Sequence, residues 1–98
     1  MTSALFTVAS SFRVPGLGLL VQPAAPAPAW LLAQPLHAAL QVRLHQPGPE
    51  TPLLPATVEE IARDGQAPAR ALLLDADPDG LLPGAALELV AVVVSLLL

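Results

Sequence analysis

The sequence predicts an all-β fold, a small antiparallel barrel of six or seven strands in a single domain that spans residues 1–98. Twelve prolines are spread along the chain, and they nearly exclude long helices because an interior proline removes a backbone donor and clashes with the preceding turn. In the proline-free windows, apolar residues recur with a period close to two, which is the spacing of a strand with one buried face.

Residues 4–14 predict the first strand. One parity of this segment is apolar and is expected to face the core: Phe6, Val8, Phe12 and Val14. The two glycines of the following "PGLGLLVQP" favour a tight turn, after which "LLVQ" can return antiparallel to the first strand. A β-hairpin is therefore predicted here.

A proline- and alanine-rich loop is predicted at residues 23–35, with its first half extended along the surface. We expect Trp30 to pack this loop onto the barrel, because one aromatic residue makes no ligand-binding platform by itself. Stacking of Trp30 on a ligand is the alternative.

Residues 36–45 give the clearest strand pattern in the chain. One parity is wholly apolar and is expected to face inward: Leu36, Ala38, Leu40, Val42 and Leu44. The opposite parity carries His37, Arg43 and His45 and is expected to face solvent.

Residues 56–64, "ATVEEIARD", allow two interpretations. Thr57 with Glu60 matches a capping box, and Val58 and Ile61 have helical spacing, so local reasoning favours a short helix. The alternative is a strand with a β-bulge, which would shift side-chain parity and bring Val58 and Ile61 to one face.

The last two apolar segments, "ARALLLDA" and "AALELVAVVVSLLL", are expected to form strands covered on both faces. Small monomers rarely leave a contiguous apolar patch in water, so the final strand is predicted to bind a second copy of the chain or another protein. The predicted interface residues are Leu89, Val90, Val92, Val93, Val94 and Leu96. The alternative is that the strand is internal and is crossed by "PAAPAPAWLL".

Composition restricts the function further. The chain has four arginines, no lysine, eight acidic residues and a net charge of -4, which disfavours DNA binding because that affinity comes largely from clustered cations. No cysteine is present, and the N-terminus lacks a basic segment before its apolar residues, so a cytoplasmic location is expected. The apolar C-terminal run of about ten residues is half the length of a membrane-spanning helix, so no membrane association is expected.

The stretch "DADPDG" resembles the start of an EF-hand calcium loop. Asp75, Asp77, Asp79 and Gly80 fall at its first, third, fifth and sixth positions, but Ala86 stands where a bidentate glutamate is needed and Glu88 comes two residues too late. We therefore interpret the stretch as a turn and expect no metal or other cofactor.

No catalytic constellation is evident from the sequence. On one strand His37 and His45 would lie roughly 26 Å apart, too far to share a metal. Neither has a serine or an acid in a recognisable relation to it. Glu59 and Glu60 would face opposite ways on a regular strand, so they make no carboxylate pair. Enzymatic activity is not expected.

Three segments, read in order, resemble the β-barrel second domain of GTP-binding translation factors such as elongation factor Tu. They are "FRVPGLGLLVQP", "ATVEEIARDG" and "ALLLDADPDGLLPGAALEL". The resemblance favours the strand interpretation of residues 56–64. The chain departs from the family pattern at Leu17, where a basic or polar residue is usual. It has no phosphate-binding glycine loop with lysine, so GTP is not expected to bind.

Together these observations predict a noncatalytic protein-interaction or accessory module on a translation-factor-like barrel. The resemblance implies one alternative, a translation-related module that binds an RNA end, although the absence of lysine counts against it. A small enzyme or a calcium-binding protein is the remaining alternative.

Overall fold

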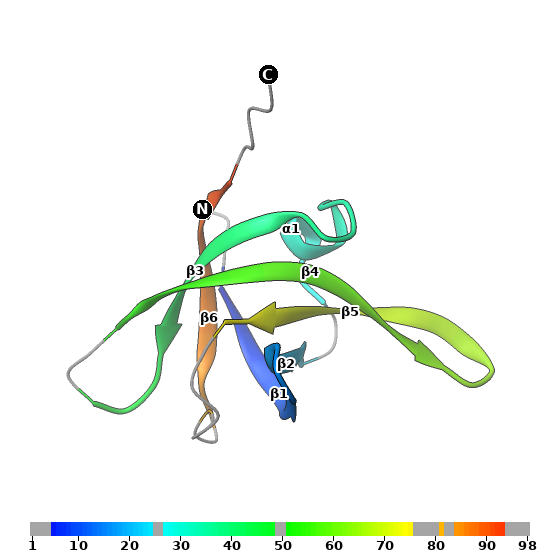
Figure 1. The fold of residues 1–98 in the computed structure, drawn as a ribbon, viewed down its shortest axis with the longest axis horizontal. Coiled ribbons are helices and arrows are strands. Elements are labelled where there is room, and N and C mark those ends of the chain that lie inside the picture. The colour runs from blue at the N-terminus through cyan, green and yellow to red at the C-terminus, as the bar shows by residue number, and fades with distance from the viewer. Residues whose placement is uncertain (1–4, 25–26, 49–50, 76–80, 82–83, 94–98) are drawn as a thin grey trace.

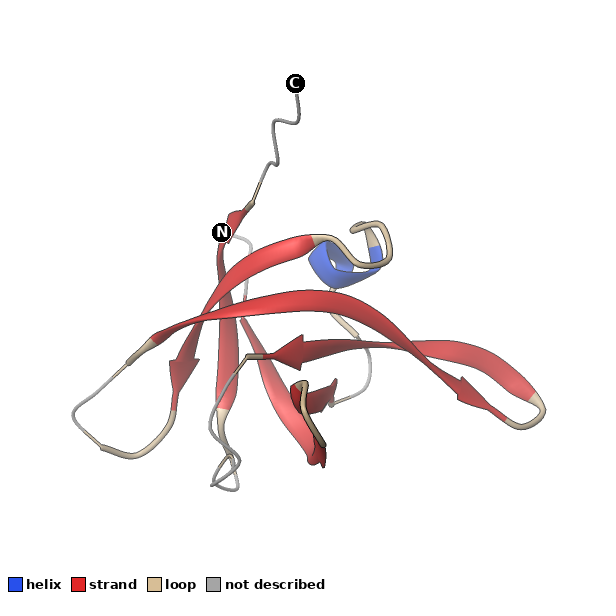
Figure 2. Ribbon diagram, in the orientation of Figure 1, coloured by secondary structure: helices blue, strands red, loops and turns tan. Residues whose placement is uncertain are grey.

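The computed structural model describes residues 5–24, 27–48, 51–75, 81 and 84–93, and within them six antiparallel strands close into a barrel (Figures 1 and 2). The predicted all-β barrel is thereby confirmed. The strands and the one helical turn are β1 (Leu5–Val14), β2 (Gly18–Pro23), α1 (Ala29–Leu32), β3 (Ala39–His45), β4 (Leu53–Arg63), β5 (Gln66–Leu74) and β6 (Ala86–Val92).

The order of strands around the barrel is β1-β2-β5-β4-β3-β6, and β6 closes onto β1. Three neighbouring pairs are hairpins between consecutive strands: β1 with β2, β3 with β4, and β4 with β5. The other three pairs of neighbouring strands, β2–β5, β1–β6 and β3–β6, join distant parts of the chain. Only three residues of each strand are paired in β2–β5 and in β1–β6. Beyond the barrel, β4 and β5 continue as a two-stranded ribbon that projects to one side (Figure 1).

Apolar side chains from all six strands and α1 fill the barrel, and no polar or charged side chain in the described ranges is buried. The period-two pattern explains which residues are inside. On β3, Leu40, Val42 and Leu44 are buried while Gln41 and Arg43 between them are not, as the sequence predicts. The largest fully buried side chains are Leu31, Leu40, Leu72, Leu74, Leu87, Val21, Val42 and Val58.

Two glycines shape the predicted hairpin between β1 and β2. The Leu17 N–H donates to the Val14 carbonyl at 2.9 Å, and Gly16 has a φ of 78°, so Val14–Leu17 forms a type II turn with Pro15 at its second position. Gly18 has a φ of 131°, and a Cβ there would overlap the carbonyl oxygen of Leu74. A residue without a side chain is therefore required where β2 begins to pair with β5.

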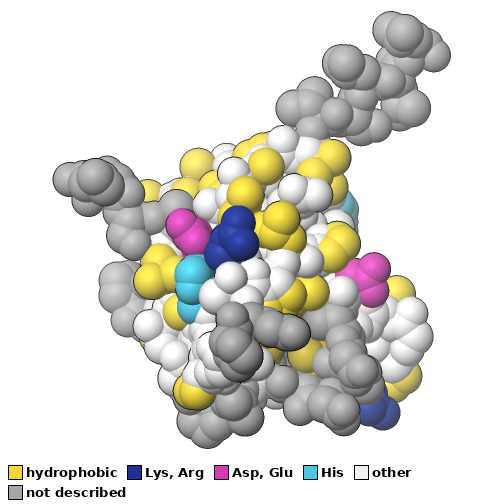
Figure 3. All heavy atoms as spheres, turned by 90° about the vertical axis from the view of Figure 1, so that its left-hand side faces the viewer, with side chains coloured by type: hydrophobic (Ala, Val, Ile, Leu, Met, Phe, Trp, Pro, Cys, Tyr) yellow, Lys and Arg dark blue, Asp and Glu magenta, His cyan; other side chains and the backbone are white. Residues whose placement is uncertain are grey.

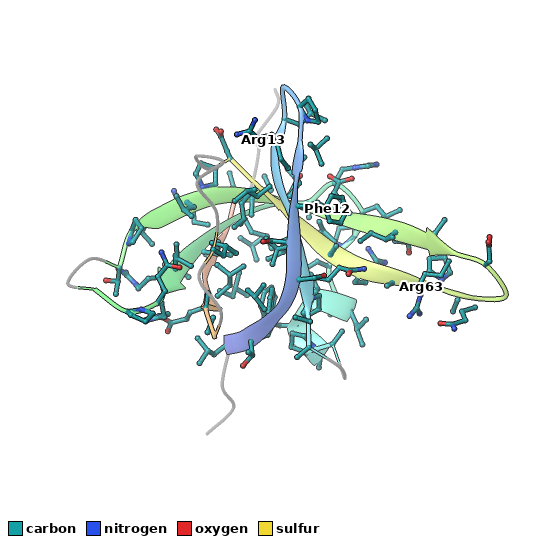
Figure 4. The ribbon with its side chains drawn as sticks, turned by 90° about the horizontal axis from the view of Figure 1, so that it is seen from below. Phe12, Arg13 and Arg63 are labelled. Atoms are coloured by element: carbon teal, nitrogen blue, oxygen red, sulfur yellow. The ribbon has the colours of Figure 1, made fainter. Side chains whose placement is uncertain are left out.

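A β-bulge in β1 corrects the predicted core. The β1–β2 register shifts between Val8 and Ser10, so side-chain parity reverses along the strand. Phe6 is buried as predicted, but Phe12 faces outward and is 49% exposed. Figure 4 shows Phe12 and Arg13 on opposite sides of β1. The prediction that Phe12 shares the inward face with Phe6 is wrong, because it assumed an unbroken strand.

The proline- and alanine-rich segment contains a helical turn that the sequence did not predict. Pro28, at φ −68° and ψ 148°, precedes α1, and no side chain caps the turn. Tertiary burial stabilises it instead, because Leu31 is fully buried in the core. Trp30 stacks on Phe6 with ring centroids 5.7 Å apart, consistent with its predicted packing role.

The strand predicted at residues 36–45 begins later than expected. β3 starts at Ala39, and His37 has a φ of 67°, a left-handed conformation that cannot continue a strand. Leu36 is consequently 42% exposed, so its predicted place on the core face is wrong. The His37 N–H donates to the Val58 carbonyl at 2.7 Å, which holds this turn against β4.

Residues 56–63 of the ambiguous segment lie within β4, and Asp64 follows in a turn, so the strand interpretation is confirmed and the helix is wrong. The predicted consequence of a bulge is also wrong. Pairing with β5 is regular from Ala56 to Ile61, and the register shifts only between Ile61 and Arg63. Val58 therefore lies in the core at 0% exposure, whereas Ile61 has the opposite parity and is only partly buried.

We predict that Gly18→Ala destabilises the barrel by about 3 kcal/mol or more, because the new Cβ adds a backbone clash to a strained φ. Gly65→Ala is the matched control: its φ of 68° is also left-handed, but nothing lies near its Cβ position, so a cost of about 1–2 kcal/mol is expected. Urea unfolding of both variants measures the difference. Equal losses would show that the approach of Gly18 to Leu74 does not constrain the fold.

Candidate functional site

The predicted interface residues begin on β6, the strand that closes the barrel. Val90 and Val92 are 43% and 45% exposed, and Val93, just after the strand, is 47% exposed. Leu89 is partly buried and packs against the core. Val94 and Leu96 lie outside the described residues. The structure thus leaves three of the predicted residues open to solvent in the single chain.

A bulge at Val90 decides which of these side chains face outward. Leu89 pairs with Val42 and Ala91 pairs with Gln41, so Val90 is the extra residue between them. Val92 pairs with Leu40, so its side chain is on the inward-facing side of the strand. It is nevertheless exposed because it lies at the end of the barrel. The Val93 N–H donates to the Ala39 carbonyl at 2.8 Å, which fixes its backbone beside β3.

The sequence predicted that the last two strands, β5 and β6, are covered on both faces. This prediction holds only for β5. On β5, Ala71, Leu72 and Leu74 are buried. The end of β6 is covered on one face at most, because the barrel has a single interior and no second layer of described residues packs outside it. In the isolated chain this expectation is therefore wrong for Val90–Val93.

A groove of about 560 Å³ lies beside Val93 on the outside of the barrel. Its floor comes from β3 and β4, and the turn between β1 and β2 forms part of its wall. Leu17, at the tip of that turn, is 61% exposed. The residues that line the groove are Gly16, Leu17, Ala39, Leu40, Gln41, Pro55, Ala56, Thr57, Leu73, Asp75 and Val93. The sequence did not predict this groove. The apolar Leu17 at the tip of a turn was the one sequence signal that could have indicated a binding surface there.

Each histidine lies beside a glutamate, which the sequence analysis missed. His37 Nδ1 is 3.1 Å from Glu59 Oε1, and Thr57 donates its hydroxyl proton to Glu59 Oε2 at 2.8 Å. His45 Nε2 is 2.9 Å from Glu88 Oε1. The sequence shows no acid in a recognisable relation to either histidine, because cross-strand register brings each glutamate to its histidine from a distant part of the chain.

The pair of His45 with Glu88 is part of a small charged cluster on the outer faces of β3 and β6. Arg43 Nε lies 4.0 Å from the same Glu88 oxygen, and Arg43 also donates to the Thr51 carbonyl at 3.2 Å. Arginine, histidine and acidic side chains gather with hydrophobic side chains around them on the face in Figure 3. Because all three members of the cluster are between 36% and 43% exposed, the cluster lies on the surface.

Glu59 and Glu60 point to opposite faces of β4, as predicted. Glu59 is opposite Ala71 and bonds with His37, whereas Glu60 is opposite Arg70, with its Oε2 3.7 Å from Arg70 Nε. The two carboxylates therefore do not form an acid–base pair.

The calcium-loop residues are only partly described. Asp75 is exposed, and its N–H donates to the Pro55 carbonyl at 3.0 Å, while Asp77, Asp79 and Gly80 lie outside the described residues. Ala86 begins β6, and Glu88 is directed toward His45. In the part of the chain that the structure describes, no group of three or more metal-ligating side chains comes together.

Comparison with known proteins assigns the chain to no group. No protein-family model, no curated protein and no solved structure matches it. The described ranges contain one helical turn, Ala29–Leu32, and no helix that is long and apolar enough to cross a membrane.

We predict that Glu88→Gln lowers the free energy of unfolding by less than about 1 kcal/mol, because exposed ion pairs contribute little. The adjacent Leu87 is fully buried, so Leu87→Ala should cost about 2–5 kcal/mol. Urea denaturation compares the two faces of β6 directly. A loss for Glu88→Gln as large as that for Leu87→Ala would give the charged cluster a structural role.

We predict that millimolar calcium leaves the thermal unfolding midpoint unchanged, because the loop lacks the glutamate that a bidentate site requires. Differential scanning fluorimetry with and without calcium measures this. A specific ligand would raise the midpoint by mass action. An increase that Asp75→Asn abolishes would therefore overturn the interpretation of this stretch as a turn.

Proposed function

We propose that the chain is a noncatalytic protein-interaction module that binds a second copy of itself through the end of β6 and the groove beside it. The observation that carries the proposal is an uncovered apolar surface. Val93 and Leu17, 47% and 61% exposed, both line the groove, and the exposed Val90 lies on the adjoining strand. Small monomers rarely leave such a surface in water.

Charge does not oppose a second copy as the occupant. The chain has a net charge of -4, so two copies repel each other wherever acidic side chains meet. Among the described residues, Asp75 is the only charged one that lines the groove, and the neighbouring valines are neutral. Two acidic chains can therefore approach here at little electrostatic cost.

Geometry supports a two-fold arrangement. In a symmetric dimer the same patch serves both partners, so the valines of one copy can lie against the groove of the other while the reverse contact forms simultaneously. The groove and the end of β6 adjoin, since Val93 belongs to both. In a self-complementary interface, a projecting surface (here the valines) and a recessed surface (here the groove) lie next to each other on the same chain.

Kinship with the second domain of translation factors, and a cytoplasmic location, remain part of this proposal. The former rests on the three sequence segments that resemble that domain, and the latter on the absence of cysteine. The glycines of the β1–β2 turn are required by local geometry, so they add no support for kinship. No described feature favours the RNA-binding alternative.

The experiment is light scattering of the intact 10.1 kDa chain over a range of concentrations. We expect the wild type to have twice the chain mass and Val93→Lys to have the mass of one chain, because a lysine at this position introduces an unpaired charge into the interface. Val93 follows β6 and is half exposed, so the variant should retain the circular dichroism spectrum of the wild type.

Leu32→Lys is the matched control. Leu32 is 55% exposed on α1 and lines no part of the groove, so the same change there should leave the dimer intact. A monomeric wild type would refute self-association. Loss of the dimer with both lysine variants, or with neither, would show that the interface is not at Val93.

A further inference from the structure

A second cleft, of about 510 Å³, lies on another part of the molecule and is lined in part by residues of the projecting β4–β5 ribbon. The ribbon forms one wall, β1 and β2 form another, and the segment that carries α1 contributes the rest. Six of the nine lining residues are apolar, and none is acidic. The lining residues are Ala9, Gln22, Pro23, Ala27, Leu32, Arg63, Pro68, Ala69 and Arg70.

Arg70 is the most unusual residue of this cleft. Its side chain is only 20% exposed. Its one ion pair among the described residues joins Nε to Glu60 Oε2 at 3.7 Å, which is longer than a hydrogen bond. Its Nη1 is buried and has no hydrogen-bond partner among the described residues. A buried donor without a partner costs stability, so this arginine contributes less to the fold than its burial would allow.

Two further donors line the same cleft. Arg63 donates from both Nε and Nη2 to the Ala67 carbonyl, at 3.1 and 2.7 Å, which fixes its guanidinium on the ribbon (labelled in Figure 4). Gln22 accepts a hydrogen bond on Oε1 from the Ser10 hydroxyl at 2.7 Å. Its amide nitrogen donates no hydrogen bond to another described residue. The cleft thus presents two cations and an amide donor within an apolar lining.

We propose that this cleft binds a monocarboxylate with an apolar body. The carboxylate would accept hydrogen bonds from Arg70, which need only turn its Nη1 toward the cleft that it already lines, and the charge of Arg63 would assist. The apolar body would lie against Leu32, Pro23 and Pro68. The bound ligand would supply the acceptor that Nη1 lacks among the described residues.

The chemistry of the lining selects a monocarboxylate over a phosphate. A phosphate carries more charge on more oxygens and would need most of its surroundings to be polar. Here the donors come from three side chains and the other six lining residues are apolar. A guanidinium matches the two oxygens of a carboxylate in its planar geometry. The carboxylate can belong to a free acid or to the C-terminus of a peptide.

Isothermal titration calorimetry with hexanoate tests the proposal, with hexanamide as the uncharged match and inorganic phosphate as the competing anion. We expect hexanoate to bind, and hexanamide and phosphate to bind about tenfold more weakly or not at all. A short peptide that ends in leucine, with a free or an amidated C-terminus, distinguishes the two sources. Tighter binding of the free peptide than of hexanoate assigns the cleft to a peptide terminus, and the reverse assigns it to a free acid.

Three variants distinguish binding of hexanoate in the cleft from a general attraction between hexanoate and the positive charges of the chain. Arg70→Met should reduce hexanoate affinity about tenfold or more while the unfolding midpoint stays equal or rises, since methionine fills the space without an unpaired donor. Arg13→Gln removes the same charge outside the cleft and should change the affinity less than about twofold. Arg63→Gln, on the exposed ribbon, should also weaken binding and does not depend on the packing of Arg70.

Three results would overturn the proposal. The first is no binding of either hexanoate or the free peptide to the wild type. The second is equal binding of hexanamide or phosphate. The third is an equal loss of affinity in Arg13→Gln and the two cleft variants, which would reduce the interaction to the overall charge of the chain.

Discussion

The barrel depends on the close approach of Gly18 to the carbonyl of Leu74. At this point β2, which is paired with β1 along one edge, begins to pair with β5 along its other edge, and the β2–β5 pairing extends over only three residue pairs. These pairs lie over the centre of the core, because Leu19 and Val21 on one side and Leu72 and Leu74 on the other are nearly or fully buried. The same junction places the turn with Leu17 beside β4, so the outer groove is a by-product of barrel closure.

The sequence predicted the fold class because proline spacing and period-two alternation act locally. It could not predict the bulges, because one extra residue in a strand leaves the composition unchanged. That residue nevertheless moves every later side chain of the strand to the opposite face of the sheet. Phe12 faces outward and Val90 interrupts β6 for that reason. The turn at Ala29–Leu32 was also missed, because Leu31 is held by the core and not by a local helix signal.

The candidate sites were predictable only where they are continuous in sequence. The apolar run after Leu89 indicated an interface, and three of its residues are exposed. Leu17 and Pro55 also line the groove, and only the strand order brings them near Val93. In sequence, Arg63 and Arg70 are simply polar residues on either side of a hairpin. Their shared cleft depends on how the ribbon leaves the barrel.

The strand order also has a consequence for folding kinetics. The run from β3 through β4 to β5 is joined by two consecutive hairpins and can form early, because short loops close at low entropic cost. Closure instead requires Leu5–Thr7 to meet Ala86–Glu88 across nearly the whole described chain. Until then, β1 and β6 have open edges and apolar faces. A slow closing step would therefore expose the chain to strand-mediated aggregation.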